Sequence, residues 1–314
     1  MKYSVVIPLY NKEHYIEKTI SSVLNQTFQD FEIIVIDDGS KDKSLSKARK
    51  LEKRSEKIRV IEQENQGVSV ARNTGVEYAK GDYIAFLDAD DEWRDNYLET
   101  IDNLTKKYPQ SDFYVTAYCV VMKKGKCNYS SQINPPEGCL ESYWMTYQYP
   151  YDFVWTSATV IRRKAILKAG GFKVGEKIGQ DLDMWARIAR NNPKVAYSSK
   201  ICVNYNRAAE SNARTRVRIA YAGAFIQDLK EELHNPIRTY EEKKMIQHKY
   251  DLKMTVYIFT SILAGEKSRA KKALKEWEGE FNLKRWCIQT CLRISAILPT
   301  FINKWAYTIR LKVF

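Results

Sequence analysis

YIAFLDADDEW, residues 83–93, joins an apolar run to a cluster of carboxylates. The apolar run predicts a buried strand, and Asp88, Asp90 and Asp91 follow where this strand ends. Like charges this close together repel one another unless a positive group lies among them. Asp88 and Asp90 are two residues apart, so an extended chain projects both side chains from one face. The fold and the chemistry of the chain both depend on what holds these carboxylates together.

A divalent metal ion is one answer. Mg²⁺ takes oxygen ligands and keeps waters beside one or two carboxylates and substrate phosphates, and Mn²⁺ suits the same ligands. We therefore expect a metal ion that carries a diphosphate at Asp88 and Asp90. The alternative is that these aspartates cap a helix that begins near Asp95.

Strands and helices alternate around this stretch through the first part of the chain. Apolar runs bounded by turn residues predict strands at 3–10, 31–40, 57–67 and 83–91. Helical spacing of apolar residues predicts helices at 12–26, 42–53, 69–79 and 95–107. This order predicts an α/β fold, with a parallel sheet that has helices on both faces.

The remainder of the chain predicts a mixed region and then a helical one. The expected elements are a strand turning at Lys124-Gly125, a strand and short helix within 158–172, an amphipathic helix at 181–192, short strands at 194–199 and 201–207, and basic helices from 213 onward.

Positive charge is concentrated in the last third of the chain. The formal net charge is +13, and residues 211–314 contribute +10 of it, with 20 Lys/Arg against 10 Asp/Glu. The six cysteines form no Cys-x-x-Cys pair, so we expect free thiols in a reducing compartment. The N-terminus has no signal-peptide pattern, and no apolar run reaches the about 18 residues of a membrane span. These features predict a cytoplasmic protein that is soluble or rests on a membrane surface.

Polar clusters follow three of the predicted strands. In an open parallel sheet, ligands bind at the carboxyl ends of the strands. The first cluster contains Pro8 and Tyr10, the second contains Asp38, and the third is the carboxylate cluster after residue 87. Asp38 would accept a hydrogen bond from a nucleobase or ribose while Tyr10 stacks on the base. The alternative for Asp37-Asp38-Gly39-Ser40 is a simple turn.

Arg72 lies in the first turns of a predicted helix that follows Gly67. Helix N-termini attract anions, which would place Arg72 near a phosphate, although a surface arginine is the alternative. The chain has neither G-x-G-x-x-G after its first strand nor G-x-x-x-x-G-K-[ST]. A dinucleotide-binding Rossmann site and a P-loop are therefore not expected.

Taken together, these segments resemble the family 2 glycosyltransferases of the GT-A fold. The matching segments, in the family's order, are SVVIPLYNKEHYIEKTISSVLNQTF, FEIIVIDDGSKDKS, ENQGVSVARNTGVEYAKGDYIAFLDADDEW and GGF…GQDLDMWARIA. They extend over residues 3 to about 207, and they are specific as an ordered set although each is weak alone. The resemblance implies glycosyl transfer from a nucleotide-diphosphate sugar, with inversion at the anomeric carbon.

The resemblance also implies the residues of the donor site. Pro8, Tyr10 and Asp38 would hold the nucleotide base. Arg72 would lie near the nucleotide and its diphosphate. Among nucleotides UDP is the expected donor, with GDP and dTDP left open.

The residues that perform the chemistry follow from the same resemblance. Asp88 and Asp90 would be the Asp-x-Asp pair, with Asp90 as the direct ligand of Mn²⁺ or Mg²⁺. Asp181 falls on the family's catalytic base, which removes the proton of the acceptor hydroxyl. This residue precedes an amphipathic helix in the predicted pattern, and the alternative is that it caps that helix.

Two positions depart from the family pattern. Gln180 stands where the family has a Glu before the base, which keeps hydrogen bonding but removes a charge. Residues 205–212 contain no histidine, whereas many relatives have one after the last strand. The metal would be held by Asp90, diphosphate and water, or with help from Glu210.

The resemblance divides the chain at about residue 212. Residues 1–212 would be the catalytic domain, with a nucleotide-binding half at 1–110 and an acceptor and catalytic-base half at 111–212. Residues 213–314 would form a basic helical extension. Its segment 281–314 contains no Asp or Glu and interleaves Lys and Arg with Trp. That composition predicts a helix in a membrane interface, with packing on the catalytic domain or a second subunit as the alternative.

The expected function is the synthesis of a bacterial surface polysaccharide such as capsule, O-antigen or exopolysaccharide. The partners would be the nucleotide sugar and a glycan or lipid-linked acceptor, at the inner face of the cell membrane. A nucleotidyltransferase is a second enzyme class, but PLYNKEHY is not the Gly-rich basic loop that such an enzyme needs. A nucleic-acid-binding protein is the non-enzymatic alternative. No nucleic-acid partner is expected, because the acidic crevice would repel phosphates in the absence of a metal.

Overall fold

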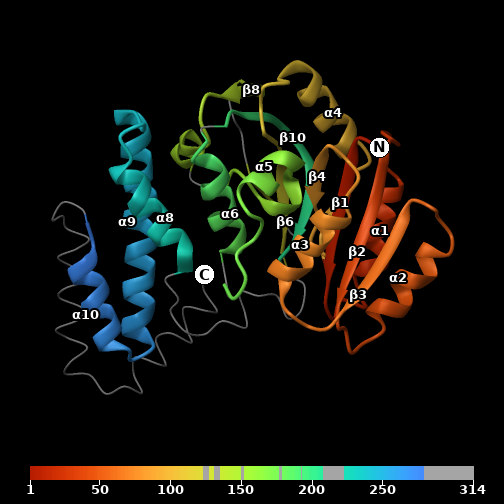
Figure 1. Cartoon of the computed structure of the whole chain (residues 1–314), viewed down its shortest axis with the longest axis horizontal. Coiled ribbons are helices and arrows are strands. Elements are labelled where there is room, and N and C mark those ends of the chain that lie inside the picture. The colour runs from red at the N-terminus through yellow and green to blue at the C-terminus, as the bar shows by residue number, and fades with distance from the viewer. Residues whose placement is uncertain are drawn as a thin grey trace. The chain divides into compact units, whose positions relative to one another are not determined.

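A computed structural model describes residues 1–122, 127–130, 135–149, 152–176, 179–191, 193–207 and 223–278. The predicted turn at 124–125, the candidate ligand Glu210 and the predicted interfacial segment 281–314 lie outside these residues. The chain divides into two compact units (Figure 1). The first contains residues 1–175 and 180–210, and the second contains 176–179 and 211–314.

The first unit is built on a ten-stranded sheet. Its strands are β1 (Tyr3–Leu9), β2 (Phe31–Asp38), β3 (Ile58–Gln63), β4 (Tyr83–Phe86), β5 (Glu92–Trp93), β6 (Phe113–Val121), β7 (Cys127–Ser130), β8 (Glu137–Leu140), β9 (Thr159–Arg162) and β10 (Val195–Asn206). The strand order is β3-β2-β1-β4-β9-β6-β10-β5, with β7 beside β6 and β8 beside β10.

The long central pairings are parallel. They join β3 to β2, β2 to β1, β1 to β4, and β6 to β10. The strand β9 is antiparallel to both of its neighbours, and the short strands β5, β7 and β8 are also antiparallel. The predicted α/β fold with a mostly parallel sheet flanked by helices is therefore confirmed.

The predicted helices of the first unit are present. They are α1 (Ile16–Leu24), α2 (Ser44–Glu52), α3 (Val68–Tyr78), α4 (Tyr97–Lys107), α5 (Arg163–Lys168) and α6 (Gln180–Ala189), with the short 3₁₀ helices η2 (Tyr143–Gln148) and η3 (Thr156–Ala158). The residue before α4 is Asn96. The alternative that the carboxylate cluster of 88–91 caps this helix is therefore wrong.

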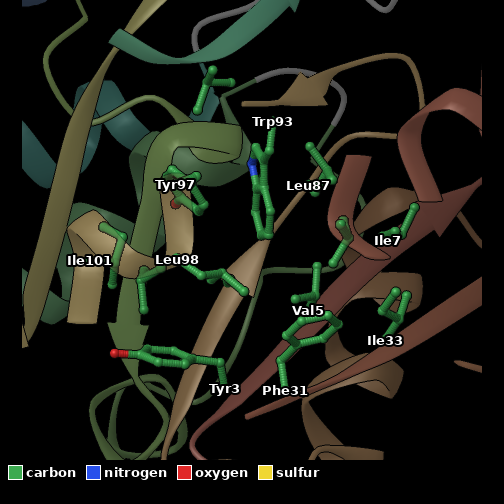
Figure 2. Packing of buried hydrophobic residues seen from close by; sticks show 14 of the residues in the cluster. Tyr3, Val5, Ile7, Phe31, Ile33, Leu87, Trp93, Tyr97, Leu98 and Ile101 are labelled. Atoms are coloured by element: carbon green, nitrogen blue, oxygen red, sulfur yellow. The ribbon is translucent and has the colours of Figure 1, made fainter. Parts of the chain in front are cut away.

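Every residue of β2 is buried because helices cover both faces of the sheet. On one face, Val5, Ile7 and Ile33 pack towards the apolar sides of α1 and α4 (Figure 2). At one end of this core the rings of Trp93 and Tyr97 lie against each other, with centroids 4.2 Å apart. Aromatic pairs at this separation add to the free energy gained by burial.

The other face of the sheet is covered by α3, which approaches β1 very closely. Gly75 lies on the inner side of α3, and a Cβ atom there would stand 2.3 Å from a methyl group of Val6. No side chain fits in that space, so glycine permits the approach. The close contact fixes the position of α3 and hence of the residues in its first turns.

The last strand of the first unit differs from its prediction. Two short strands were predicted at 194–199 and 201–207, but β10 is one strand of 12 residues. Its pairing with β6 shifts register between Ser198 and Ile201 and again between Ile201 and Val203. The polar Ser-Ser-Lys segment that predicts a break therefore lies at an irregularity within a continuous strand.

The described part of the second unit is helical, as predicted. It contains α8 (Gly223–His234), α9 (Tyr240–Leu263) and α10 (Lys267–Glu276). Thr239 and Glu242 form a reciprocal capping box at the start of α9. Among the described residues no helix has the length and apolarity needed to cross a bilayer. Among the described residues, Cys139 and Cys202 form no disulfide.

Candidate active site

The candidate active site begins at the carboxyl ends of β1, β2 and β4. These strands are parallel neighbours, so their ends lie at one edge of the sheet. Pro8 and Tyr10 are half-buried at the end of β1, and Asp38 is the last residue of β2. Asp88 follows β4. The fold therefore brings the four predicted donor-site positions on these strands to a common edge.

Asp38 is buried, and the connection between β3 and α3 occupies its carboxylate. Oδ1 accepts a hydrogen bond from the Gln66 amide at 2.9 Å, and Oδ2 accepts one from the Gly67 amide at 2.8 Å. Asp37 accepts from the Ser40 amide at 3.1 Å, so the turn considered as the alternative for this segment is present. Asp38 shapes the start of α3, and its contact with a nucleotide stays a prediction.

Arg72 projects from the first turns of α3 and is buried rather than on the surface. Its guanidinium lies over the ring of Phe172, 5.3 Å from the centroid. Asn73 holds Phe172 in place through two backbone hydrogen bonds of 2.9 and 2.7 Å. At Gly171 the backbone has φ +71°, and a Cβ atom would lie 2.7 Å from Asn73. The Gly-Gly-Phe motif thus builds the platform on which Arg72 rests.

The protein itself supplies positive partners for the carboxylates that follow β4. Arg72 Nη2 lies 2.7 Å from Asp88 Oδ1, and Lys12 Nζ lies 2.5 Å from Asp90 Oδ2. Burial raises the pKa of the Asp90 carboxyl, whereas the adjacent Lys12 ammonium opposes that rise. The side chain of Asp88 stays 33% exposed and that of Asp90 14% exposed. Both carboxylates therefore reach the surface at the edge of the sheet.

Asp91 differs from the other two carboxylates of the cluster. It is 1% exposed, and it accepts hydrogen bonds from Ser157 Oγ at 2.6 Å and from the Asn206 amide at 2.8 Å. Burial raises its pKa well above the usual range, and the neighbouring Asp90 and Asp88 carboxylates add to the rise. Asp91 joins the end of β4 to η3 and β10, and it is not positioned to bind a ligand.

The donor set at Asp88 and Asp90 fits a hard divalent ion. Each carboxylate uses one oxygen for the protein cation beside it. Mg²⁺ and Mn²⁺ bind through one or two carboxylates together with phosphate and water. Among the residues that the structure describes, no group of three or more His, Cys, Asp or Glu side chains could hold a metal ion. A metal ion held by Asp88 and Asp90 would have further positions for phosphate and water.

Asp181 lies in the first turn of α6, not before the helix as predicted, and so it is not an N-cap. Its Oδ2 accepts a hydrogen bond from Thr156 Oγ1 at 2.9 Å, and its Oδ1 accepts from the Leu182 amide at 2.9 Å. Asp183, two residues further on, is buried and paired with Arg187 at 2.6 Å. Of the two acidic residues in this turn, only Asp181 is free of an ion pair among the described side chains.

Three residues that contact the candidate site residues were not predicted from the sequence. Lys12 lies in the loop after β1, and Thr156 and Ser157 lie in η3, a helix too short to have a hydrophobic period. A lysine after a strand and two hydroxyl residues are ordinary surface signals, so nothing in the local pattern distinguishes them. Glu210, the other candidate ligand, lies outside the described residues.

The chain is an α/β protein with acidic residues at the ends of β2 and β4, and comparison with known families identifies its class. The family described as Glycosyl transferase family 2 matches residues 4–169, which is more than half of the chain. The chain belongs to that family. Of the classes that the sequence left open, this match supports the glycosyltransferase.

Curated relatives match the chain over about a third of its length. It is 39% identical over 117 residues to glycosyltransferase GlyA of Streptococcus pneumoniae, covering 37% of this chain and 17% of that protein. It is 45% identical over 97 residues to the putative teichuronic acid biosynthesis glycosyltransferase TuaG of Bacillus subtilis, covering 31% of this chain and 38% of TuaG. The chain thus matches less than two fifths of the length of either relative.

Solved structures share the fold over a longer span. A crystal structure of S. aureus TarS in complex with UDP-GlcNAc has a TM-score of 0.71 at 19% identity, and it covers 88% of this chain and 80% of that one. The mannosyltransferase PcManGT of Pyrobaculum calidifontis, in complex with GDP-Man and Mn²⁺, has a TM-score of 0.58 at 16% identity. It covers 99% of this chain and 86% of that one. At such identities the likeness establishes the GT-A fold.

Proposed function

We propose that this protein transfers a sugar from a nucleotide-diphosphate sugar to a saccharide acceptor with inversion of configuration. One observation carries the proposal. The short helix η3 is hydrogen-bonded to the connection that contains Asp88 and Asp90 and also to Asp181: Ser157 Oγ accepts from the Asp88 amide, and Thr156 Oγ1 donates to the Asp181 carboxylate. Family membership supports the reaction class. UDP is the proposed nucleotide, supported by the complex of TarS with UDP-GlcNAc.

In the proposed donor site, the base would lie between Tyr10 and Asp38 beside Pro8. Arg72 would face the diphosphate, since its guanidinium already stands at the end of β4. Asp90, with Asp88, would hold Mn²⁺ or Mg²⁺, which when bound neutralises charge on the leaving diphosphate. The complex of PcManGT with Mn²⁺ supports this choice of ion.

Asp181 is the proposed general base. Its carboxylate would accept the proton of the acceptor hydroxyl as that oxygen bonds to the anomeric carbon. The bond between the anomeric carbon and the diphosphate oxygen breaks in the same displacement, and the nucleoside diphosphate leaves. A single displacement needs one base. Asp183 cannot readily fill that role because it is buried against Arg187.

The proposed acceptor is a glycan or lipid-linked saccharide of a bacterial surface polysaccharide. The name of TuaG, a putative teichuronic acid biosynthesis enzyme, supports this class. The basic, Trp-containing composition of 281–314 supports contact with anionic lipid at the inner face of the membrane. Sedimentation of the whole chain with anionic vesicles, but not with neutral ones, would test that contact.

Asp181→Asn tests the proposed reaction. The amide keeps the shape of the carboxylate, so donor binding should stay near the parental value. Transfer should fall by roughly 10²–10⁴-fold, because proton abstraction is lost. Isothermal titration with UDP and Mn²⁺ and a transfer assay on a panel of nucleotide sugars would measure the two effects. Asp183→Asn is the matched control, and it should lower thermal stability more than transfer per folded molecule.

A variant that keeps more than half of the parental transfer rate would move the base away from Asp181. Glu210 would be the next residue to test. If no nucleotide sugar is bound or hydrolysed by the parent protein in the presence of either metal, the proposed function itself is wrong.

A further inference from the structure

The 3₁₀ helix η3 contacts both sides of the candidate active site through two consecutive hydroxyl groups. Thr156 Oγ1 donates to Asp181 Oδ2 at 2.9 Å. Ser157 Oγ donates to Asp91 Oδ2 at 2.6 Å and accepts a hydrogen bond from the Asp88 amide at 3.2 Å. Thr156 is 2% exposed and Ser157 is fully buried. Neither hydroxyl can therefore exchange its partner for bulk water without movement of the chain.

We propose that Thr156 is a positioning residue that holds the carboxylate of Asp181 in its reactive orientation. The inference rests on the proposed function, because it assigns Thr156 a role only if Asp181 is the base. The Leu182 amide binds one carboxylate oxygen and Thr156 binds the other, so both oxygens are fixed. A carboxylate oxygen has two lone pairs, and Oδ2 keeps one for the incoming proton.

The orientation of a general base has a large effect on the reaction rate. The base must lie within about 2.6–3.2 Å of the group whose proton it takes. A displacement of about 1 Å can reduce the rate on the order of 10²-fold. Asp181 lies in the first turn of its helix, where no ion pair with a described residue fixes it. Among the described side chains, the Thr156 hydroxyl donates the hydrogen bond that fixes the direction of the carboxylate.

The position of Thr156 is itself fixed from the donor side of the site. Trp93 Nε1 donates to the carbonyl oxygen of Ser157 at 2.7 Å, in addition to the hydrogen bonds of the Ser157 hydroxyl. The loop with Asp88 and Asp90 is thereby joined to η3, and η3 is joined to Asp181. Two adjacent residues thus set the spacing between the proposed base and the proposed diphosphate site.

Thr156→Val is the central test. Valine has the shape of threonine without the hydroxyl, so the core stays filled while the hydrogen bond to Asp181 is lost. We expect kcat for transfer to fall about 10- to 100-fold, with the KM for donor and the affinity for UDP and Mn²⁺ within about twofold of the parent. Thr156→Ser keeps the hydroxyl and should recover most of the rate.

Thr159→Val is the matched control. The Thr159 hydroxyl is buried in the next element, but it donates to the backbone oxygen of Trp155 at 2.6 Å and not to Asp181. A merely structural role predicts similar losses of stability and transfer for both valine variants. The positioning role predicts that only Thr156→Val lowers kcat per folded molecule. If Thr156→Val does not fold, Thr156→Ala replaces it, since its smaller side chain cannot clash.

Two results would overturn the inference. One is transfer by Thr156→Val, or by Thr156→Ala, at the rate of Thr156→Ser. The other is a further large loss when Thr156→Val is added to Asp181→Asn, because a residue that acts through the base should have no effect once the base is gone. If Asp181→Asn alone keeps full transfer, the assignment of the base is wrong. If Asp181→Asn loses transfer and Thr156→Val does not, only the present inference is wrong.

Discussion

The two units of this protein each contain an arginine buried against carboxylates, but the two clusters differ in exposure. In the first unit Arg72 pairs with Asp88, whose side chain stays 33% exposed. In the second unit Arg238 pairs with Glu232 at 2.6 Å, and their side chains are 0% and 3% exposed. A buried arginine paired with an acid is therefore present in both units, and it does not by itself mark an active site.

The difference lies in how the carboxylate oxygens are used. In the second unit, Glu232 also accepts a hydrogen bond from Asn235 at 3.1 Å, and the nearby Glu242 closes the capping box of α9. The carboxylates of Glu232 and Glu242 thus bind neighbouring protein groups. In the first unit, Asp88 and Asp90 each face one protein cation and still reach the surface. Exposure of the acid at a strand end distinguishes a candidate ligand from a structural ion pair.

Asp90→Asn should have the largest effect and should separate function from stability. Losing the ligand oxygen should lower transfer on the order of 10³-fold, because a bound divalent ion contributes several kcal/mol of charge stabilisation. The melting temperature should change little, since ionised Asp90 is disfavoured by burial. Calorimetry with UDP, with and without Mn²⁺, measures the loss of metal-dependent binding.

The control for this prediction is Asp95→Asn, a change at an exposed carboxylate between β5 and α4. It should leave transfer, nucleotide affinity and melting temperature near the parental values. Unchanged metal-dependent UDP binding in Asp90→Asn would show that the exposed cluster is not the ligand site. Partial exposure of Asp88 and Asp90 would then not distinguish a ligand site from the buried ion pairs of Arg238 in the second unit.

Arg238→Met should have the opposite signature, with a loss of stability and little loss of chemistry. Removing one partner of a buried ion pair leaves a buried charge uncompensated and typically costs about 3–5 kcal/mol. Glu232 and Glu242 would each lose the ion pair with Arg238. Denaturant unfolding should show the loss, while transfer per folded molecule should be retained because the proposed catalytic residues lie in the first unit.

Lys272→Met provides the comparison for Arg238→Met. Lys272 pairs with Glu276 at 3.9 Å, and both side chains are more than half exposed. Exposed pairs of this kind contribute about 0–1 kcal/mol. Equal destabilisation by the two variants would mean that the buried ion pairs of Arg238 contribute no more to stability than an exposed pair. The proposed structural role of the Arg238 cluster would then be wrong.

The sequence predicted the sheet of the first unit because the signals for its elements are local. Each strand of the N-terminal half is a short apolar run, and each helix has apolar residues at helical spacing, so the period of the pattern identifies the element. The short strands β5 and β8 were not predicted, and in β10 the pattern predicts a break at Lys200 but the strand continues. Residues on both sides of this polar segment pair with β6, and that pairing depends on tertiary structure rather than on the local pattern.

The candidate site could be predicted only in part, for the same reason. Asp88, Asp90 and Asp38 lie at or just after strand ends. Each follows an apolar run, so the local sequence is enough to predict a candidate ligand position there. The contact of Lys12 with Asp90 spans 78 residues, and that of Thr156 with Asp181 spans 25. Such pairs cannot be predicted from a local period or motif, because they arise when η3 and the loop after β1 pack against the sheet. Asp91 was grouped with its neighbours, and only its burial separates it from them.

Asp102 offers the smallest and most specific test of the comparison, because its cluster is intermediate between the other two. Its side chain is 4% exposed, but its partners Lys2 and Lys106 are 27% and 71% exposed. Burial alone would raise the pKa of the Asp102 carboxyl, yet hydrogen bonds from Lys106 and Lys2 together outweigh burial and lower the pKa. The folded state therefore favours the ionised carboxylate.

The sign of the pH effect follows from this lowered pKa. Stabilisation by ionised Asp102 is fully present above the pKa of an unfolded Asp, about 4, and it is lost as the pH falls through the lower pKa of the folded state. Asp102→Asn should therefore be less stable than the parent at pH 7, by about 1 kcal/mol or less because the lysines are exposed. The difference should shrink towards zero in acid. Denaturant unfolding at a series of pH values from 7 to about 3 measures this convergence. A deficit that stays constant across that range would mean that the hydrogen bonds of Asp102, and not its charge, stabilise the first unit.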